Sequence, residues 1–278
     1  MRVLILGGQG MAGHMIVSYF NQLPDFKVNY TTKVKTSNNS IVLDVRDTDK
    51  VAILLRELKP DIVINCVGLL NENAARNLVD AIKVNSLLPH KLANVMNEYG
   101  GKLIHISTDC VFSGQKGDYH EAEEADGTTI YAKTKSLGEV KSEPHLTIRT
   151  SIIGPELKED GIGLFHWFMN QSGEIKGYKK VWWNGVTTLE LAKVIEQMIK
   201  QNTTGLYHLT APIKIAKYDL LKIIQDVFNK NEVIILPDEV QQLDRTLVNT
   251  RSDFVYTVPH YQTMIQELND WMKSNDQG

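Results

Sequence analysis

The sequence predicts an α/β protein built on a doubly wound parallel sheet, followed by a smaller C-terminal domain. Short apolar runs alternate with helical stretches through the first 150 residues, and the first run, Val3–Leu6, leads directly into a glycine-rich turn. An uninterrupted apolar run is typical of a strand buried on both faces of a parallel sheet. The length of 278 residues suits a large domain with a smaller partner, and 42% hydrophobic with 23% charged residues is ordinary for a globular chain.

The expected elements follow this alternation. In the first half the strands are 3–6, 27–31, 61–65, 102–107 and 146–149, and the helices are 11–22, 47–58, 74–98 and 131–142. In the second half the helices are 188–201, 216–229 and 260–274, with a short strand at 205–209. The boundaries rest on local signals such as Asp47, an acidic helix cap, and Pro60, which stops the same helix. We therefore expect domains at 1–150 and 151–278, with helix 188–201 packing back on the first.

Composition and charge exclude several classes of protein. The net charge of −3 gives no basic face, so nucleic acid is not an expected partner. The two cysteines, Cys66 and Cys110, are too few for a disulfide framework, and no Cys/His spacing indicates a metal site. The apolar runs are too short to cross a bilayer, and the N-terminus lacks the pattern of a signal peptide. We expect a cytoplasmic protein without a metal or a membrane partner.

Glycines at positions 7, 10 and 13 form a G-x-x-G-x-x-G turn between the first strand and the first helix. Such a turn lets the backbone approach a pyrophosphate, and the helix N-terminus adds unpaired N–H groups and partial positive charge. A plain strand-to-helix turn is the alternative. The position at the first strand–helix junction favours dinucleotide binding on a Rossmann sheet.

The end of the second strand indicates which dinucleotide is bound. An acidic residue there usually holds the ribose 2′-hydroxyl of NAD. Residues 29–35 contain no acid, and Thr31, Thr32 and Lys33 would suit the 2′-phosphate of NADP(H). A solvated loop is the alternative. We expect NADPH as the cofactor, with NADH as the second choice.

Two hydroxyl groups and a lysine point to carbonyl chemistry. Thr108 ends a predicted strand, where α/β folds gather their ligands, and Tyr131 and Lys135 lie four residues apart on one helix face. A nearby ammonium should lower the pKa of the phenol, which could pass a proton to a carbonyl oxygen as hydride reaches the carbon. Tyr218 and Lys222 repeat the spacing without a preceding strand-end hydroxyl, and we interpret them as part of an ordinary amphipathic helix.

The chain resembles an extended short-chain dehydrogenase/reductase. The likeness is carried, in order, by the glycine turn, by Asn65-Cys66-Val67-Gly68, by Ser107-Thr108-Asp109 and by Tyr131-x-x-x-Lys135. Segments 107–114, 131–139, 148–151 and 205–209 are similar, more narrowly, to the dTDP-4-dehydrorhamnose reductase branch. The resemblance covers residues 1–150 well and 185–260 loosely. It implies that Thr108, Tyr131 and Lys135 are the catalytic residues.

The resemblance also implies a cofactor site. The residues implied to face the diphosphate are Gly7, Gln9, Gly10, Met11 and Gly13. Those implied to lie by the adenine are Asp44 and Val45, and those implied to lie along the cofactor are Val67, Gly68, Tyr131 and Lys135. Asn85 matches an asparagine on the family's following helix, and a polar residue on a helix face is its alternative reading.

Two departures from the branch concern the sugar pocket. Residues 181–188 replace the family's Asp-Gln-x-Gly-x-Pro-Thr run, and residues 245–250 resemble its Arg-Pro-x-Asn-Ser element with one extra residue. The expected substrate contacts are Thr108, Phe112, Trp182, Trp183 and Arg245. Arg245 could clasp a diphosphate bidentately, whereas a surface arginine and tryptophans packed between domains are the alternatives.

The resemblance implies an enzyme with a C-terminal substrate-binding domain. The expected reaction is NADPH-dependent reduction of the 4-keto group of a UDP- or dTDP-linked 4-keto-6-deoxysugar, for polysaccharide or glycan synthesis. The departure at 181–188 inclines us to a UDP-linked 2-acetamido sugar. A nucleotide-sugar epimerase and a non-catalytic NADP-binding regulatory subunit are the alternatives, and a homodimer is left open.

Overall fold

The computed structural model describes residues 1–275. Its main sheet has seven parallel strands in the order β10-β6-β5-β4-β1-β2-β3. These strands are β1 (Arg2–Leu6), β2 (Lys27–Thr32), β3 (Ser40–Val42), β4 (Ile62–Asn65), β5 (Lys102–Ile106), β6 (Leu146–Arg149) and β10 (Gly205–His208). The strand order reverses beside β1, which places a topological switch point at the glycine turn. The predicted doubly wound sheet is confirmed.

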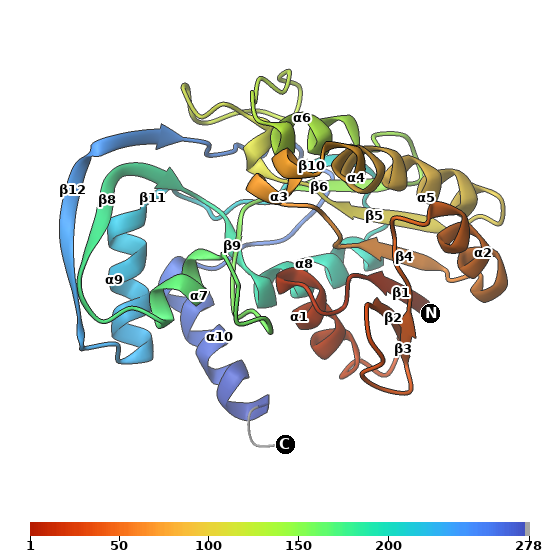
Figure 1. The fold of residues 1–278 in the computed structure, drawn as a ribbon, viewed down its shortest axis with the longest axis horizontal. Coiled ribbons are helices and arrows are strands. Elements are labelled where there is room, and N and C mark those ends of the chain that lie inside the picture. The colour runs from red at the N-terminus through yellow and green to blue at the C-terminus, as the bar shows by residue number, and fades with distance from the viewer. Residues whose placement is uncertain (276–278) are drawn as a thin grey trace.

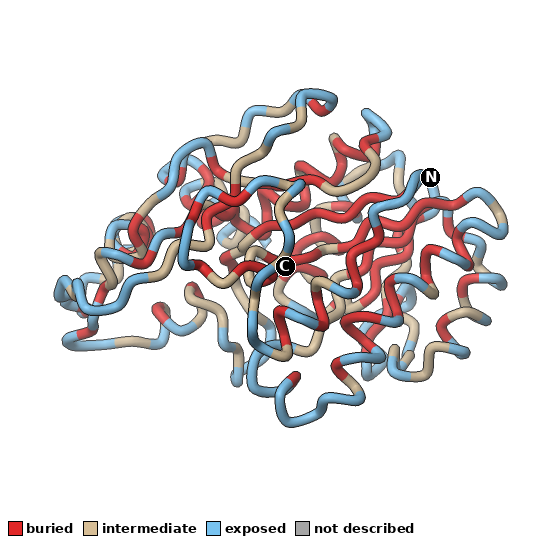
Figure 2. The backbone as a smooth tube through the Cα atoms, turned by 90° about the horizontal axis from the view of Figure 1, so that it is seen from above, coloured by how far each residue is buried: buried red, intermediate tan, exposed pale blue. Residues whose placement is uncertain are grey.

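Helices cover both faces of this sheet (Figure 1). One layer contains α1 (Met11–Phe20) and α8 (Thr188–Lys200), and the other contains α2 (Thr48–Leu58) and α5 (Leu88–Asn97). Each layer buries its own apolar cluster against the strands, and Figure 2 shows the strands as the most continuously buried part of the chain. An amphipathic helix on each face of a continuously apolar strand explains why both clusters form.

Most boundaries agree with the sequence signals. Asp47 accepts a hydrogen bond from the Lys50 N–H and caps α2, which ends at Leu58; its C-cap, Lys59, immediately precedes Pro60. The expected helix 74–98 is instead broken into α3 (Asn71–Arg76), α4 (Leu78–Ala81), a π-helical turn η1 (Ile82–Leu87) and α5. The helix after the acidic loop, α6 (Ile130–Leu137), is capped by Thr129, whose hydroxyl accepts from the Ala132 N–H.

The second half of the chain contributes to two places. Its strand β10 pairs with β6, so the main sheet takes its seventh strand from beyond residue 150, and α8 packs on α1. The remaining chain forms a separate lobe around the sheet β11-β8-β12, with α9 (Lys217–Phe228) against it (Figure 1). The strands of this sheet are β8 (Gly173–Trp183), β11 (Ile215–Ala216) and β12 (Val233–Asp244). The same part of the chain also contains the two-stranded pair β7 (Ile152–Ile153) and β9 (Val186–Thr187), and the helices α7 (Leu164–Met169) and α10 (Tyr261–Asn275). The division at residue 150 stays a prediction.

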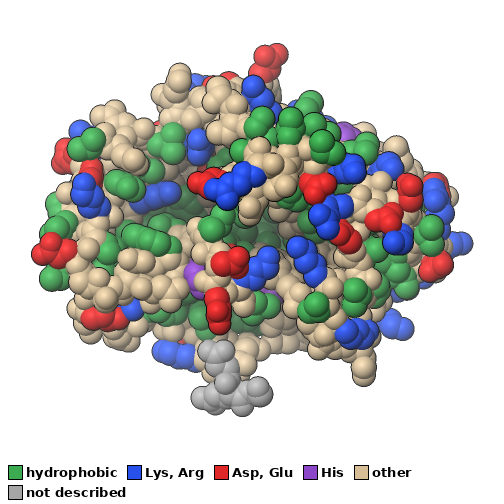
Figure 3. All heavy atoms as spheres, in the orientation of Figure 1, with side chains coloured by type: hydrophobic (Ala, Val, Ile, Leu, Met, Phe, Trp, Pro, Cys, Tyr) green, Lys and Arg blue, Asp and Glu red, His purple; other side chains and the backbone are tan. Residues whose placement is uncertain are grey.

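The long strands β8 and β12 were not expected. β8 has charged residues on its solvent side, and β12 begins with the short apolar run 233–236 but is interrupted at Pro237 and continues with polar residues. Their parallel pairing joins segments some sixty residues apart, which local pattern cannot reveal. Figure 3 shows acidic and basic side chains interspersed over the face seen in Figure 1. No helix within residues 1–275 has the length and apolar character needed to span a membrane.

Candidate active site

The glycine turn lies between β1 and α1 and is held by the end of β2. The Gly7 N–H donates to the Thr31 hydroxyl at 3.1 Å, and the Gly8 N–H donates to the Thr31 carbonyl at 2.9 Å. Gly7 has a φ of +82°, and a Cβ on Gly13 would lie 2.1 Å from the Gly7 carbonyl oxygen, so the turn requires glycine at both positions. Within residues 1–275 no side chain caps α1 at Gly10. The N-terminus of α1 therefore offers N–H groups to an anion, as a dinucleotide diphosphate requires.

The residues expected to hold a 2′-phosphate are placed unequally. Thr31 and Thr32 are buried, and their hydroxyls are engaged, Thr31 by the Gly7 N–H and Thr32 by donating to the Val34 carbonyl at 2.6 Å. Lys33 is exposed just beyond the strand. A charged head group at this position can reach a phosphate, whereas the two threonine side chains support the turn.

The expected adenine residues follow β3. Asp44 is exposed and paired with Arg46, whose guanidinium lowers the pKa of Asp44 to about 2. Val45 is partly buried against the cluster beneath α2 and α5. Asp44 and Val45 thus lie at the edge of the sheet on the same side as Lys33. The positive charge of Lys33 also lowers the pKa of Asp44.

The loop after β4 approaches the glycine turn from the other side. The Val67 methyl group would lie 2.9 Å from a Cβ on Gly7, so Val67 forms a wall of the turn. Asn85, on η1, is fully buried; its amide accepts from the Leu69 N–H at 2.8 Å and donates to the Leu69 carbonyl and the Thr134 hydroxyl at 2.9 and 3.1 Å. Asn85 therefore ties the loop that contains Gly68 to helix α6.

The two expected catalytic hydroxyls are brought together. Thr108 caps the short turn η2 (Asp109–Val111), accepting from the Cys110 N–H at 3.1 Å, and its hydroxyl donates to the Asp109 carboxylate at 3.0 Å. The Tyr131 hydroxyl from α6 interacts with the Thr108 hydroxyl, and both side chains are less than 10% exposed. A carbonyl oxygen placed between them could accept a hydrogen bond from Tyr131, and one from Thr108 if the Thr108 hydroxyl turned its proton away from Asp109.

The Tyr131 phenol differs from the sequence expectation. Its pKa is raised, chiefly by burial and by Cys110, against the lowering effect of Thr108. Lys135 is directed elsewhere: its amine donates to the Ile106 carbonyl at 2.7 Å and lies 3.2 Å from His105 Nε2. The expectation that Lys135 lowers the pKa of Tyr131 is therefore wrong for this structure, because desolvation of the phenolate outweighs it.

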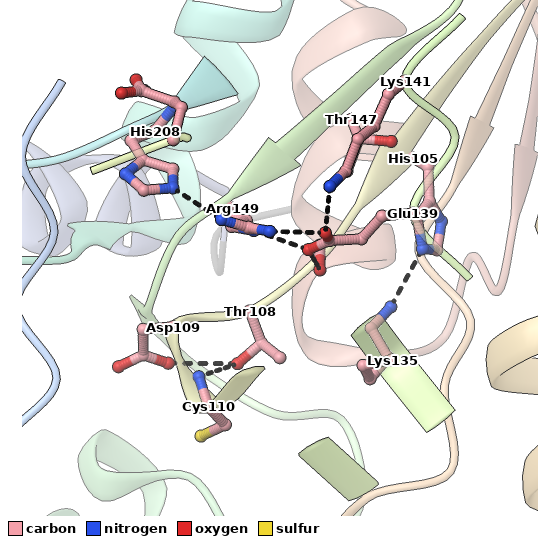
Figure 4. A network of polar contacts seen from close by, with 12 residues as sticks. His105, Thr108, Asp109, Cys110, Lys135, Glu139, Lys141, Thr147, Arg149 and His208 are labelled. Carbon is pink, nitrogen blue, oxygen red and sulfur yellow. Dashed lines mark hydrogen bonds and ion pairs between the residues drawn. The ribbon is translucent and has the colours of Figure 1, made fainter. Parts of the chain in front are cut away.

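A buried ionic network supports the strand that carries Thr108, and the sequence reasoning did not identify it (Figure 4). Arg149 donates to both carboxylate oxygens of Glu139 at 2.7 Å, and the Ser107 hydroxyl donates to Glu139 at 2.9 Å. His208 Nε2 faces Arg149 at 3.2 Å. Glu139 lies just after α6, Ser107 just after β5, Arg149 on β6 and His208 on β10, so only the tertiary fold brings these residues together.

The expected substrate residues are placed differently from one another. Phe112 is fully buried and stacks on Tyr119, although its carbonyl accepts from Arg245 Nε at 3.0 Å. Arg245 also lies 3.7 Å from the Cys110 sulfur, two residues along the chain from Thr108. Trp183 is buried, with its indole N–H donating to the Ser151 hydroxyl at 2.8 Å, whereas Trp182 is 38% exposed. Besides Thr108, Arg245 and Trp182 are thus the side chains of this set that are accessible to a ligand.

Taken together, the geometry provides an anion-binding helix terminus, a paired threonine and tyrosine, and an arginine beside them. The glycine turn follows β1 and Thr108 follows β5, with β4 between them, so both lie at the carboxyl edge of the sheet, where α/β folds bind ligands. Such a set can bind a dinucleotide and donate a proton to a carbonyl oxygen.

Known proteins are similar to this chain over most of its length. The methionine adenosyltransferase 2 subunit beta of Danio rerio is 24% identical over 255 residues, covering 85% of this chain and 76% of that protein. The spore coat polysaccharide biosynthesis protein SpsK of Bacillus subtilis is 28% identical over 156 residues, covering 54% of this chain and 52% of that protein.

Solved structures share the fold. A dTDP-4-dehydrorhamnose reductase from Clostridium acetobutylicum has a TM-score of 0.80 at 23% identity, covering 98% of this chain and 100% of that chain. The dTDP-4-dehydrorhamnose reductase from Bacillus anthracis in complex with NADP has a TM-score of 0.82 at 20% identity, covering 96% and 98%. The family described as the RmlD substrate binding domain matches residues 1–272, and this chain belongs to that family.

Proposed function

We propose that this protein uses NADPH to reduce the 4-keto group of a nucleotide-diphospho-4-keto-6-deoxysugar in polysaccharide or glycan synthesis. The observation that carries the proposal is the buried pairing of the Thr108 and Tyr131 hydroxyls beside the glycine turn, in a member of the RmlD family. The names of the NADP-bound reductase and of the polysaccharide biosynthesis protein support both the cofactor and the pathway class.

The residues of the chain have distinct roles in this reaction. Bound NADPH supplies the hydride. Tyr131 carries its proton at neutral pH, as a phenol ordinarily does, and it can donate that proton to the carbonyl oxygen. The Thr108 hydroxyl orients the same oxygen. Lys135, held by the Ile106 carbonyl, lies on the same helix as Tyr131 and would face the nicotinamide ribose.

The cofactor would lie across the glycine turn. The N–H groups at the start of α1 suit the diphosphate, and a Cβ on Gly10 would meet only the Gly7 carbonyl oxygen at 3.4 Å, so space remains for a close approach. Lys33 is our choice for the 2′-phosphate, because the neighbouring threonine hydroxyls are engaged. This assignment favours NADPH over NADH.

The sugar nucleotide would occupy the space between the strand ends and the second lobe. Arg245 is our choice for the diphosphate contact and Trp182 for the sugar or base. The departure of residues 181–188 from the rhamnose-reductase pattern supports a UDP-linked 2-acetamido sugar over the dTDP-linked rhamnose precursor. A preference measured as kcat/KM for the two nucleotides decides between them.

Turnover tests the main proposal. Purified protein, NADPH and dTDP- or UDP-4-keto-6-deoxysugars should give cofactor oxidation followed at its absorbance. Tyr131→Phe should retain NADPH binding and lose about 10²–10⁴-fold in turnover, because only proton donation is removed. Tyr218→Phe is the matched control, since Tyr218 has the same spacing to Lys222 but lies on α9 beside Lys179. Near-normal turnover in Tyr131→Phe would contradict the assigned role.

A non-catalytic nucleotide-binding subunit is the second candidate. It is favoured by the similarity to methionine adenosyltransferase 2 subunit beta over 85% of the chain. The two functions separate in one experiment: a regulatory subunit binds NADPH but oxidises none with any 4-keto sugar nucleotide. An epimerase would instead convert sugar nucleotides without net oxidation of added NADPH.

A further inference from the structure

Three buried polar side chains form a row behind the catalytic hydroxyls. Asn65 and His105 occupy paired positions at the ends of the parallel strands β4 and β5, and Lys135 reaches them from α6. Asn65 Nδ2 lies 3.1 Å from His105 Nδ1, and His105 Nε2 lies 3.2 Å from Lys135 Nζ. Figure 4 shows the second contact, with the imidazole edge directed at the amine.

The orientation of Asn65 is set by the backbone. Its carbonyl oxygen accepts from the Val67 N–H at 3.2 Å, and this N–H can only donate. The Asn65 amide N–H therefore points at His105 Nδ1, which must accept. A neutral imidazole has one N–H, so the proton of His105 lies on Nε2.

This tautomer has a consequence for Lys135. The Nε2–H of His105 is directed at Lys135 Nζ. An ammonium group has donors only, so it would set one N–H against another across 3.2 Å. A neutral amine can accept the His105 proton through its lone pair while still donating to the Ile106 carbonyl at 2.7 Å.

We propose that Asn65 and His105 are positioning residues that control whether Lys135 carries a proton: Asn65 holds the imidazole proton on Nε2, and that N–H favours the neutral amine. The significance of this pair for catalysis rests on the proposed function, in which Lys135 acts beside Tyr131. The pair itself is a property of the folded chain without substrate.

Other titratable groups near Asn65, His105 and Lys135 also affect whether Lys135 carries a proton. Burial lowers the pKa of Lys135 to about 8 and that of His105 well below its ordinary value. Glu139, just after α6, and Cys66, just after β4, favour the ammonium, although Glu139 is already paired with Arg149 and burial raises the pKa of the Cys66 thiol to about 12. His90 on α5 acts on His105 in the direction that keeps the imidazole neutral.

The row also connects Lys135 to the cofactor turn. To favour the ammonium, His105 must carry its proton on Nδ1, and Asn65 must then turn its oxygen toward the ring. That rotation removes the acceptor from the Val67 N–H, and Val67 is the wall beside Gly7. Proton binding at Lys135 and the position of this wall are therefore linked, and the linkage is reciprocal.

Nuclear magnetic resonance of the full-length protein without cofactor tests the proposal directly. In ¹⁵N-histidine-labelled protein, His105 is assigned as the ring signal lost in His105→Gln. We expect the Nε2–H tautomer. In ¹³C-lysine-labelled protein, Lys135 is assigned as the signal lost in Lys135→Met, and its titration midpoint is measured. An Nδ1–H tautomer in the wild type would overturn the proposal.

Two variants and a control measure the effect on Lys135. The Gln side chain in His105→Gln can present an oxygen to the amine, and the carboxylate in Asn65→Asp can accept from both Val67 N–H and His105 Nδ1–H. Both should raise the Lys135 midpoint by about one pH unit or more, because a charged hydrogen bond replaces a repulsive contact. Asn65→Asp should also move the His105 proton to Nδ1, which the added negative charge alone does not explain.

The control is His145→Gln. His145 is equally buried but accepts from the Leu103 N–H and acts near Lys102, so it should leave the Lys135 midpoint unchanged. An unchanged midpoint in folded His105→Gln overturns the proposal, and if that variant does not fold, Asn65→Asp decides in the same way. These readouts need no substrate, so a protein without reductase activity would refute the proposed function and leave this result standing.

Discussion

Replacing Glu139 with glutamine should cost far more stability than the same replacement in a matched surface pair. Glu139 and Arg149 are each 1% exposed and joined by two hydrogen bonds of 2.7 Å, with a third from the Ser107 hydroxyl at 2.9 Å. Glutamine turns an amide N–H group toward these donors and leaves the guanidinium without its counter-charge. Breaking a buried pair from one side costs about 3–5 kcal/mol.

The chain provides its own control in Arg56 and Glu98. This pair has the same residue types and the same two-bond geometry, at 2.8 and 2.6 Å, but its side chains are 52% and 46% exposed. Water screens an exposed pair, and Glu98→Gln should therefore cost about 0–1 kcal/mol.

Urea unfolding of the two variants and the wild type measures the difference. We expect Glu139→Gln to lower the free energy of unfolding by at least about 2 kcal/mol more than Glu98→Gln does. The slope of the free energy against urea should be similar in all three proteins, since the unfolded surface is the same. If the two variants lost equal free energy of unfolding, burial would not explain the contribution of the Glu139–Arg149 pair to stability.

Three further predictions concern cofactor and pH. Gly10→Ala should fold normally, because its Cβ would meet only the Gly7 carbonyl oxygen at 3.4 Å, yet fluorescence titration should show NADPH binding at least about tenfold weaker. Lys33→Ala should reduce the preference for NADPH over NADH about ten- to a hundredfold, measured by the same titration with both cofactors. Burial lowers the pKa of His208 to about 4, so the unfolded chain binds a proton at this residue more readily than the folded chain does. The stability that this gives is fully present above about pH 6.5, and the free energy of unfolding should fall by on the order of 3 kcal/mol toward pH 4. His208→Gln should flatten that part of the stability–pH curve.

Much of the fold could be predicted because its signals are local. Strands β1 and β4 are apolar runs buried on both faces. Asp47 caps the start of helix α2, and Pro60 follows its end. The catalytic candidates could be predicted for a related reason: parallel strands end at one edge of the sheet, so Gly7 and Thr108, at separate strand ends, must lie at the same edge.

Features that depend on tertiary contacts could not be predicted. Trp182 and Trp183 are neighbours in sequence, but alternation along β8 exposes the first and buries the second, and the strand itself was not recognised. The sequence alone presents Thr31 and Thr32 as possible phosphate contacts. In the fold, the Thr31 hydroxyl accepts from the Gly7 N–H and the Thr32 hydroxyl donates to the Val34 carbonyl. Glu139 and Arg149 are ten residues apart with no periodic relation, so only the approach of the segment after α6 to β6 pairs them.

The Tyr131 phenol shows how such a contact alters a functional argument. Spacing alone placed an ammonium near the phenol and predicted a lowered pKa, but the Ile106 carbonyl and His105 hold the amine, and burial raises the pKa of Tyr131 instead. A reductase needs the protonated phenol, since reduction consumes its proton, whereas oxidation of an alcohol needs the phenolate as a base. A phenol with its ordinary pKa of about 10 is already protonated at neutral pH, so burial keeps Tyr131 in the acid form that reduction requires but makes it a weaker proton donor. The raised pKa, which contradicts the expectation from spacing, is therefore compatible with proton donation to a ketone and does not by itself select the direction of the reaction.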